Sequence, residues 1–326
     1  MFAPAVGPDL GQALAAFWHG SLGSPYAIVS ATLVRATPLI LTGLAVAIAF
    51  RAGVLNIGAD GQFLAGATAA AVLGVALSGP TGHVPLRFLA LSAALVGGTM
   101  LGAGWAGVAA WLRRRFGVLE VISTIMLNFI ALEAVAYLVR GPLQEPSRVY
   151  PQTQALPSAM HLPRLVPGSR LHIGFALAVL AAVVAWWVLR STAPGFRARV
   201  VGASPTAAAS AGRIDVARVT LSAFLISGAL AGLAGAVEVT GVTYALYDNI
   251  SPGYGYTAIA VALLADLHPL GVIASGIFFG ALEAGAAAMQ RDAGVPAIVA
   301  TVVEAGLVLA VLAAERGRIR FQASRA

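Results

Sequence analysis

Three polar side chains interrupt an otherwise apolar stretch near the start of the chain, and together they could bind a polar solute. Asn56, Asp60 and Gln62 lie among four glycines in FRAGVLNIGADGQFLAGA, residues 50–67. Polar groups on unwound backbone at membrane depth persist only where protein buries them or where they line a wet cavity. This arrangement indicates a solute path. The alternative is a glycine-rich turn in which Asp60 stabilises the start of a helix.

Two further polar side chains lie inside apolar runs. Glu238 interrupts the run 219–244, and an ionisable residue inside a membrane span is by default a hypothesis of function. The alternative for Glu238 is a carboxylate close to the outer interface. Asn128 interrupts the run 120–139. It could contact a solute or hydrogen-bond two helices together, which is the commoner use of such a residue.

No group of residues in the sequence is arranged to make or break covalent bonds. The chain has no cysteine, and its five histidines show no metal-ligand spacing. All twenty basic residues are arginine, so the lysine of a phosphate-binding loop is missing. We therefore expect no catalytic residue, no metal site and no cofactor in this chain. An intramembrane enzyme is disfavoured because the spans contain no Ser/His or His/Asp pair.

A polar, basic segment at 194–218 separates two long apolar runs. It carries four arginines, Arg197, Arg199, Arg213 and Arg218. Ser204 suits a helix N-cap, Pro205 the first helical position and Gly212 the end of a helix. The pattern predicts a short helix on a basic loop, on which a soluble partner could push. The alternative is a solvated loop whose arginines only set the topology.

The elements that must position these residues are transmembrane helices. The chain is 59% hydrophobic and only 10% charged, where a globular domain has about 25% charged residues. Runs of about 20 apolar residues follow one another, without the short alternating segments of a β-barrel. The sequence predicts an all-α polytopic bundle of about 8–10 helices. The expected spans are 28–50, a second ending near 77, 86–112, 120–139, 173–189, 219–244, 256–289 with a break at 265–269, and 297–314.

Arginine placement orients these spans. Thirteen arginines fall in the segments that would face the cytosol and six in those that would face outward. This is the bias of the positive-inside rule and puts the C-terminus in the cytosol. Residues 140–171 then form an outer loop, and residues 1–25 an interfacial segment with an amphipathic patch at 10–17. The net charge of +7 lies mostly at span ends, which makes nucleic acid an improbable partner.

Small residues recur where helices should touch. Gly98, Gly102 and Ala106 are spaced by four, and the run 219–244 has glycines at 228, 232 and 235. Small residues on one face allow close helix contact in a membrane. A short apolar segment, a polar break and a glycine-containing restart occur both at 43–62 and at 256–270. Such weak internal similarity is what inverted repeats leave behind.

Several long blocks carry a family resemblance. FRAGVLNIGADGQFLAGA and FGVLEVISTIMLNFIALEAVAYLVRGPLQEP resemble permease subunits of bacterial ATP-binding cassette (ABC) importers for nucleosides and simple sugars. These subunits belong to the branched-chain amino acid/ribose permease superfamily. GFRARVVGASPTAAASAGRI, SGALAGLAGAVEVTGVTYAL and GYGYTAIAVALLADLHPLG agree in order and spacing. The resemblance runs from about residue 24 to the end of the chain.

The resemblance implies partners and a place in the cell. The chain would be a multi-pass inner-membrane subunit of bacteria, with a type II ABC importer-like fold. It would pair with a second, similar permease, and an extracytoplasmic substrate-binding lipoprotein would deliver the ligand. Cytosolic ABC ATPase subunits, which hold the ATP and magnesium, would dock on the inner loops. The coupling residues would be Ser204, Pro205, Ala208, Ala211, Gly212 and Arg213.

The resemblance also implies a neutral, polar ligand. Its path should then offer amide, hydroxyl and backbone groups, for which Asn56, Gln62, Asn128 and Thr257 are candidates beside Asp60 and Glu238. The main alternative is an ion-coupled secondary transporter that uses intramembrane carboxylates. The carboxylates available to it are Glu133, Glu238 and Glu283.

Overall fold

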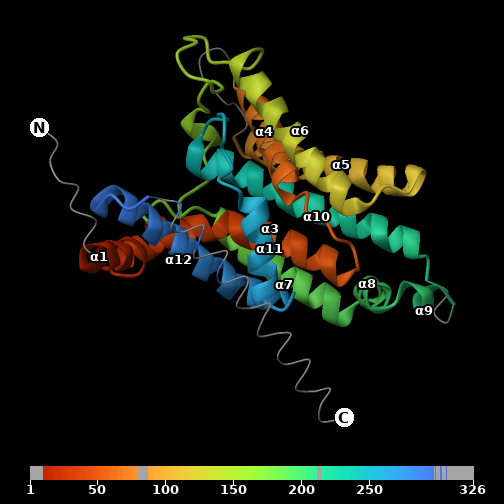
Figure 1. Ribbon diagram of the computed structural model, residues 1–326. Helices are drawn as coiled ribbons and strands as arrows, with labels where there is room; N and C mark the ends of the chain where they lie inside the picture. The colour runs from red at the N-terminus through yellow and green to blue at the C-terminus, as the bar shows by residue number, and fades with distance from the viewer. Residues whose placement is uncertain are drawn as a thin grey trace, which may run out of the picture.

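The computed structural model describes residues 10–78, 87–210 and 214–296, together with residues 298, 302 and 306. Those residues form a helical bundle, with two isolated β-bridges and no strand among them (Figure 1). The α-helices are α1 Leu10–Ser21, α2 Pro25–Ala27, α3 Leu33–Arg51, α4 Ala59–Ala76, α5 Arg87–Phe116, α6 Glu120–Arg140, α7 Gly174–Ser191, α8 Ala193–Ala203, α9 Pro205–Ser210, α10 Val216–Glu238, α11 Tyr254–Leu264 and α12 Pro269–Ala293. The other elements are the π-helices η1 Ile28–Thr32 and η3 Val239–Thr243 and the 3₁₀ turn η2 Ser158–Met160.

Within the described ranges, seven helical segments are long and apolar enough to cross a membrane. They coincide with the first seven spans expected from the sequence, which confirms the all-α polytopic fold. The eighth expected span, 297–314, lies outside the described residues. The third span continues as helix to Phe116, beyond the expected end at 112, and Gly117 follows it with a φ of 69°. The arginines at 113–115 are therefore helical.

Helix α3 is the centre of the bundle. It contacts α7, α10, α11 and α12, and most of its residues are buried. From Ala36 to Phe50 it carries no charged residue on any face, as expected for a helix surrounded by other helices. The start of this span contains Arg35 and Pro38, and its backbone is irregular. The chain enters α3 through the π-helix η1.

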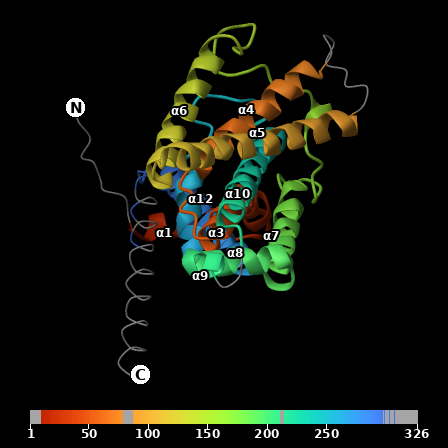
Figure 2. The same cartoon turned by 90° about the vertical axis from the view of Figure 1, so that its right-hand side faces the viewer.

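The small residues of α5 and α10 form a close helix contact. A Cβ atom placed on Gly98 would lie 2.6 Å from Ala236 Cβ, and one on Gly102 would lie 2.5 Å from Gly232 Cα. Figure 2 shows the two helices crossing side by side. The predicted glycine contacts are confirmed, and they bring the backbones of α5 and α10 together.

The predicted break between α11 and α12 is also present. Asp266 and Leu267 have positive φ angles of 50° and 54°. His268 then caps α12, since its Nδ1 accepts a hydrogen bond from the Gly271 N–H at 3.3 Å. Arg51, at the end of α3, donates to the carbonyl oxygens of Leu267 at 3.0 Å and Asp266 at 3.4 Å. The two polar breaks in the sequence therefore meet at one end of the bundle.

The basic segment at 194–218 differs in one detail from its expected form. The part before Ser204 is the helix α8 and not a loop, because Thr192 Oγ1 accepts a hydrogen bond from the Gly195 N–H and Pro194 occupies the first turn. Helices α8 and α9 lie together at the end of the bundle where α7 ends and α10 begins (Figures 1 and 2). We call this pair of helices the α8–α9 arm.

His172 lies at the end of the long segment between α6 and α7. It is buried against Gly241, and its Nδ1 accepts a hydrogen bond from the Gly174 N–H at 3.2 Å. Its Nε2 is buried without a hydrogen-bond partner among the described residues. Burial, together with the nearby Arg170 charge, lowers the pKa of His172 from 6.5 to about 4.

This depressed pKa predicts that stability falls with acid. Between about pH 6.5 and pH 4 the unfolded chain binds a proton at His172 that the folded chain does not. Stability is therefore complete above pH 6.5 and is lost as the pH falls toward 4, by about 3 kcal/mol over the window. Thermal unfolding in detergent at several pH values measures this loss. His172→Gln should flatten the profile, and an equally steep profile in that variant would contradict the assignment.

Candidate functional site

Asn56 and Gln62 form a buried amide pair beside α10. Asn56 Nδ2 donates to Gln62 Oε1 at 3.1 Å and to Ser227 Oγ at 2.8 Å. Gln62 Nε2 donates to Asn56 Oδ1 at 3.0 Å, and the Gly58 N–H donates to the same oxygen at 2.9 Å. All three side chains are buried. The pair joins the unwound segment before α4 to α10, and its amide groups are occupied by protein.

Asn128 holds the same unwound segment from α6. Its Oδ1 accepts from the Gly61 N–H at 2.8 Å, and its Nδ2 donates to the Ile57 carbonyl at 2.9 Å. Its Nδ2 also lies 3.3 Å from the hydroxyl of Tyr256 on α11. Asn128 thus hydrogen-bonds α6 to the start of α4 and to α11. Tyr256 is partly exposed, so this group borders open surface.

Asp60 caps α11 from the start of α4. Its Oδ1 accepts hydrogen bonds from Ser251 Oγ at 2.7 Å and from the Gly255 N–H at 3.0 Å. A Cβ atom placed on Gly255 would lie 2.6 Å from Asp60 Cβ, so the two backbones are in close contact. The carboxylate therefore satisfies backbone and hydroxyl donors of a helix start.

This geometry gives a test of the two hypotheses for Asp60, a residue of the solute path or a carboxylate that stabilises the start of a helix. Asp60→Asn keeps an Oδ1 acceptor for Ser251 and Gly255, so we expect near wild-type stability and uptake. Asp60→Ala leaves those buried donors unpaired and should destabilise the protein by about 1–3 kcal/mol. Thermal unfolding of both variants measures the difference. An Asp60→Asn protein that is stable but inactive would assign the carboxylate a direct role in transport.

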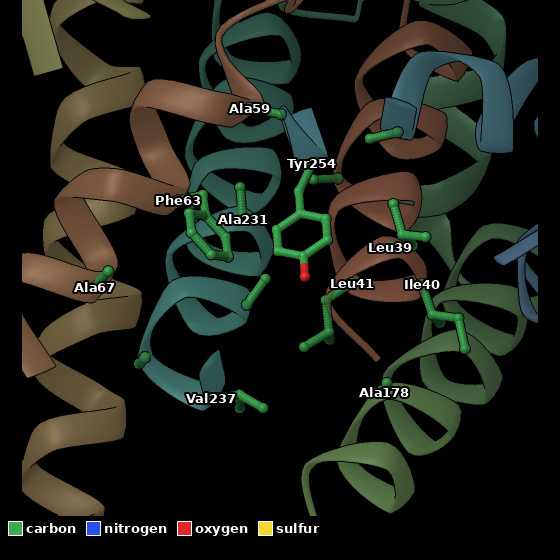
Figure 3. Close-up of a cluster of buried hydrophobic side chains, with 14 of the residues drawn as sticks. Leu39, Ile40, Leu41, Ala59, Phe63, Ala67, Ala178, Ala231, Val237 and Tyr254 are labelled. Atoms are coloured by element: carbon green, nitrogen blue, oxygen red, sulfur yellow. The ribbon is translucent and has the colours of Figure 1, made fainter. Parts of the chain in front are cut away.

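The last two predicted path residues lie apart from these groups. Thr257 is on α11 beside Tyr256, and its side chain makes no hydrogen bond with any residue that the structure describes. Glu238 is at the far end of α10. Between them, Tyr254 packs on Phe63 with ring centroids 5.5 Å apart, and Figure 3 shows it among Leu41 and Ala231. Asn56, Gln62 and Asn128 therefore hold the unwound segment before α4. Asp60 holds the start of α11, while Thr257 and Glu238 lie outside both groups.

Glu238 borders a polar cavity of about 330 Å³ beside the segment that connects α6 and α7. We call it the Glu238 cavity. Its walls are Ser30, Val34, Arg35, Arg170, Glu238, Val242, Thr243, Tyr247 and Tyr254. Glu238 is 6% exposed, and its carboxylate makes no hydrogen bond or ion pair within the described ranges.

A second carboxylate inside a span lies on open surface. Glu133 of α6 is exposed and borders a cavity of about 350 Å³ with Tyr137 and Arg140. Tyr137 is 72% exposed. A charged side chain facing lipid at this depth is costly, so this face of α6 requires water or protein beside it.

The α8–α9 arm places the predicted coupling residues as follows. Ser204 Oγ accepts a hydrogen bond from the Ala207 N–H at 3.3 Å, which confirms Ser204 as the N-cap, and Pro205 begins α9. Ala208 is fully buried and its carbonyl accepts from the Ile214 N–H at 3.0 Å. Thr206, Ala207, Ala209 and Ser210 are exposed. Ala211, Gly212 and Arg213 lie outside the described residues.

Sequence reasoning missed the partners of the site residues. Ser227 and Ser251 lie 171 and 191 residues from Asn56 and Asp60 in the chain. Arg170 and Tyr247 reach the Glu238 cavity from connecting segments. No local pattern marks any of these four residues. Of the residues described, no three His, Cys, Asp or Glu side chains are grouped as a metal site would require.

Comparison with known families identifies the class of protein. Residues 28–312 match the family described as branched-chain amino acid transport system / permease component. The chain belongs to this permease family. The match covers every span that forms the site, so the polar groups described above lie in a transport subunit and not in an enzyme.

Individual relatives agree with the family. The permease is 39% identical over 308 residues to the guanosine ABC transporter permease protein NupP of Bacillus subtilis, covering 93% of this chain and 86% of the relative. It is 39% identical over 294 residues to the glucose ABC transporter permease protein TsgB13 of Haloferax volcanii, covering 87% and 75%. It is 29% identical over 267 residues to a second guanosine permease of B. subtilis, NupQ, covering 78% and 79%.

Proposed function

We propose that this permease is the transmembrane subunit of an ATP-driven importer for nucleosides or related simple sugars. It lies in the inner membrane with its C-terminus in the cytosol. The observation that carries the proposal is the α8–α9 arm, a capped short helix held beyond the ends of α7 and α10. The names of NupP and TsgB13 support the choice of ligand class.

The arm has the form that mechanical coupling needs. Ala208 is fully buried, so α9 rests firmly on the permease, while Ala209 and Ser210 are exposed to a partner. Helix α8 contacts α3, α7 and α10, so a push on α9 reaches the centre of the bundle. ATP binding in a docked ATPase can shift the permease between inward- and outward-open states only if the two states bind the ATPase differently. We propose that α9 makes this contact, while the ATP and magnesium stay on the ATPase.

A second permease is the proposed partner within the membrane. B. subtilis has two guanosine permeases that match this chain, at 39% and 29% identity. The exposed Glu133 and Tyr137 of α6 need a polar or protein neighbour. We propose that the second permease covers this face and that a substrate-binding lipoprotein delivers the ligand to the outer side.

This interface predicts a specific cross-link. The chain has no cysteine, so Tyr137→Cys can be labelled at one position with a benzophenone maleimide in the assembled importer. We expect illumination to join it to the second permease. Leu180→Cys on α7, also exposed, is the matched control and should not reach that partner. Labelled Tyr137→Cys that joins only to lipid would place the partner on another face.

The solute path remains a proposal for six residues. Asn56, Asp60, Gln62, Asn128, Glu238 and Thr257 are those named from the sequence. The hydrogen bonds of Asn56, Gln62 and Asp60 are made within the permease, which favours a role in holding the path's walls. Asn128, through Tyr256, and Glu238, through its cavity, are better placed to meet a ligand.

Purification from the native membrane tests the proposed function. Extraction in mild detergent, followed by mass spectrometry, should recover the permease with a P-loop ATPase and a second permease. Recovery of the permease without an ATPase, in a preparation that still transports, would contradict the proposal.

A further inference from the structure

The Glu238 cavity holds charges that the permease itself does not pair. Arg35 and Arg170 line the cavity with Glu238, yet none of the three forms an ion pair within 4 Å among the described residues. Burying charged groups costs free energy unless partners compensate for the lost water. Glu238 is buried, whereas Arg35 is partly buried and Arg170 is exposed, so the cost falls mainly on the Glu238 carboxylate. A ligand that enters the cavity and hydrogen-bonds to this carboxylate offsets that cost.

We propose that the Glu238 cavity binds the vicinal hydroxyl groups of the sugar ring of the transported solute. This inference rests on the proposed function, since it takes a nucleoside or simple sugar as the ligand. The cavity of about 330 Å³ is at the lower end of the range of small-molecule sites, about 300–1,000 Å³. It has room for a sugar ring but not for a peptide.

The backbone around the cavity is irregular on two sides. Ser30 belongs to the π-helix η1, and Val242 and Thr243 belong to the π-helix η3. Single π-helical turns are rare and occur often at functional sites. Tyr244, directly after η3, has a φ of 57°, a conformation that a side chain of this size seldom adopts. Two backbone segments that lie far apart in the sequence are therefore irregular where they border the same cavity.

The chemistry of the walls selects the ligand. The Glu238 carboxylate can accept hydrogen bonds from two neighbouring hydroxyl groups, and the guanidinium groups of Arg35 and Arg170 can donate to hydroxyl oxygens. The rings of Tyr247 and Tyr254 offer apolar surface for the face of a sugar ring or base.

The test compares ligands that differ by one hydroxyl group. Proteoliposomes containing the whole importer are loaded with ATP-regenerating components, and uptake of guanosine is compared with uptake of 2′-deoxyguanosine. Glucose and 2-deoxyglucose form a second pair. A hydrogen bond to a charged group corresponds to a preference of about tenfold or more for the full ligand. We expect this preference in the wild type and a ratio near one in Glu238→Gln.

Two further variants keep the test decisive. Asp292→Asn removes an exposed carboxylate near the end of α12, and it should keep the wild-type preference. If Glu238→Gln fails to assemble, Val242→Trp fills the cavity without changing a charge, and it should lower uptake of both ligands at least tenfold.

The outcomes separate this inference from the proposed function. Three results would each overturn the inference and leave the proposed importer function intact. They are a wild-type preference in Glu238→Gln, normal uptake in Val242→Trp, and a wild type that does not distinguish the ligands. A wild-type importer that takes up neither guanosine nor glucose would overturn the proposed ligand class, and the inference with it.

Discussion

ATP-driven uptake falls by about tenfold or more when Ala209 is replaced by tryptophan, because coupling free energies of this kind usually correspond to 5- to 150-fold effects. Ala209 is exposed on α9, next to the buried Ala208 that anchors the helix. The indole ring would therefore leave the permease folded but hold a docked ATPase away from α9. Uptake into proteoliposomes measures the loss, and thermal unfolding verifies the fold.

Ala155→Trp is the matched control for this variant. Ala155 is exposed on the segment between α6 and α7. The N–H of the next residue, Leu156, donates to the Tyr244 carbonyl beyond the C-terminal end of α10, whereas the α8–α9 arm lies where α10 begins. We expect wild-type uptake from it. Normal uptake and ATPase stimulation in Ala209→Trp would remove α9 from the coupling mechanism.

The second large effect is on stability and comes from one added methyl group. A Cβ atom on Gly102 would lie 2.5 Å from Gly232 Cα, where backbone on both sides leaves no room. Gly102→Ala should therefore destabilise the permease by about 1–3 kcal/mol through overpacking. Thermal unfolding in detergent gives the size of the effect, and poor membrane yield would accompany it.

Gly104 offers a control on the same helix. No atom lies within 4 Å of a Cβ placed there. Gly104→Ala should be neutral or stabilise α5 by about 0.5–1 kcal/mol, since alanine favours a helix interior over glycine. Equal destabilisation by the two substitutions would show that glycine acts through backbone freedom and not through the contact between α5 and α10.

The sequence was sufficient for features that depend on local patterns. Apolar run length located the described spans, the spacing of Gly98 and Gly102 marked the contact of α5 with α10, and the polar break before Pro269 marked the end of α11. Each of these features depends on residues within one helical turn or one membrane span. Membrane burial makes these patterns strong, because the backbone must satisfy its own hydrogen bonds there.

The sequence was insufficient wherever partners come from distant segments. As a carboxylate among glycines, Asp60 suggests a residue of the solute path. In the structure its Oδ1 atom accepts hydrogen bonds from Ser251 and Gly255, which lie 191 and 195 residues away in the chain. Glu238 differs from Asp60 because it faces a cavity. Nothing near Glu238 in the sequence predicts that Arg35 and Arg170 line the same cavity. Which polar residue is satisfied by protein and which faces a cavity is decided by tertiary contacts alone.

One uptake measurement decides whether ATP drives this permease. The co-purified importer is reconstituted in proteoliposomes with its binding protein, and guanosine uptake is followed with ATP or a non-hydrolysable analogue on the cytosolic side, with and without an ionophore. We predict uptake that requires hydrolysable ATP and is unchanged when ion gradients collapse. Uptake by the permease alone that stops with the ionophore would contradict ATP-driven transport and would make Glu133, Glu238 and Glu283 the candidate ion-coupling groups.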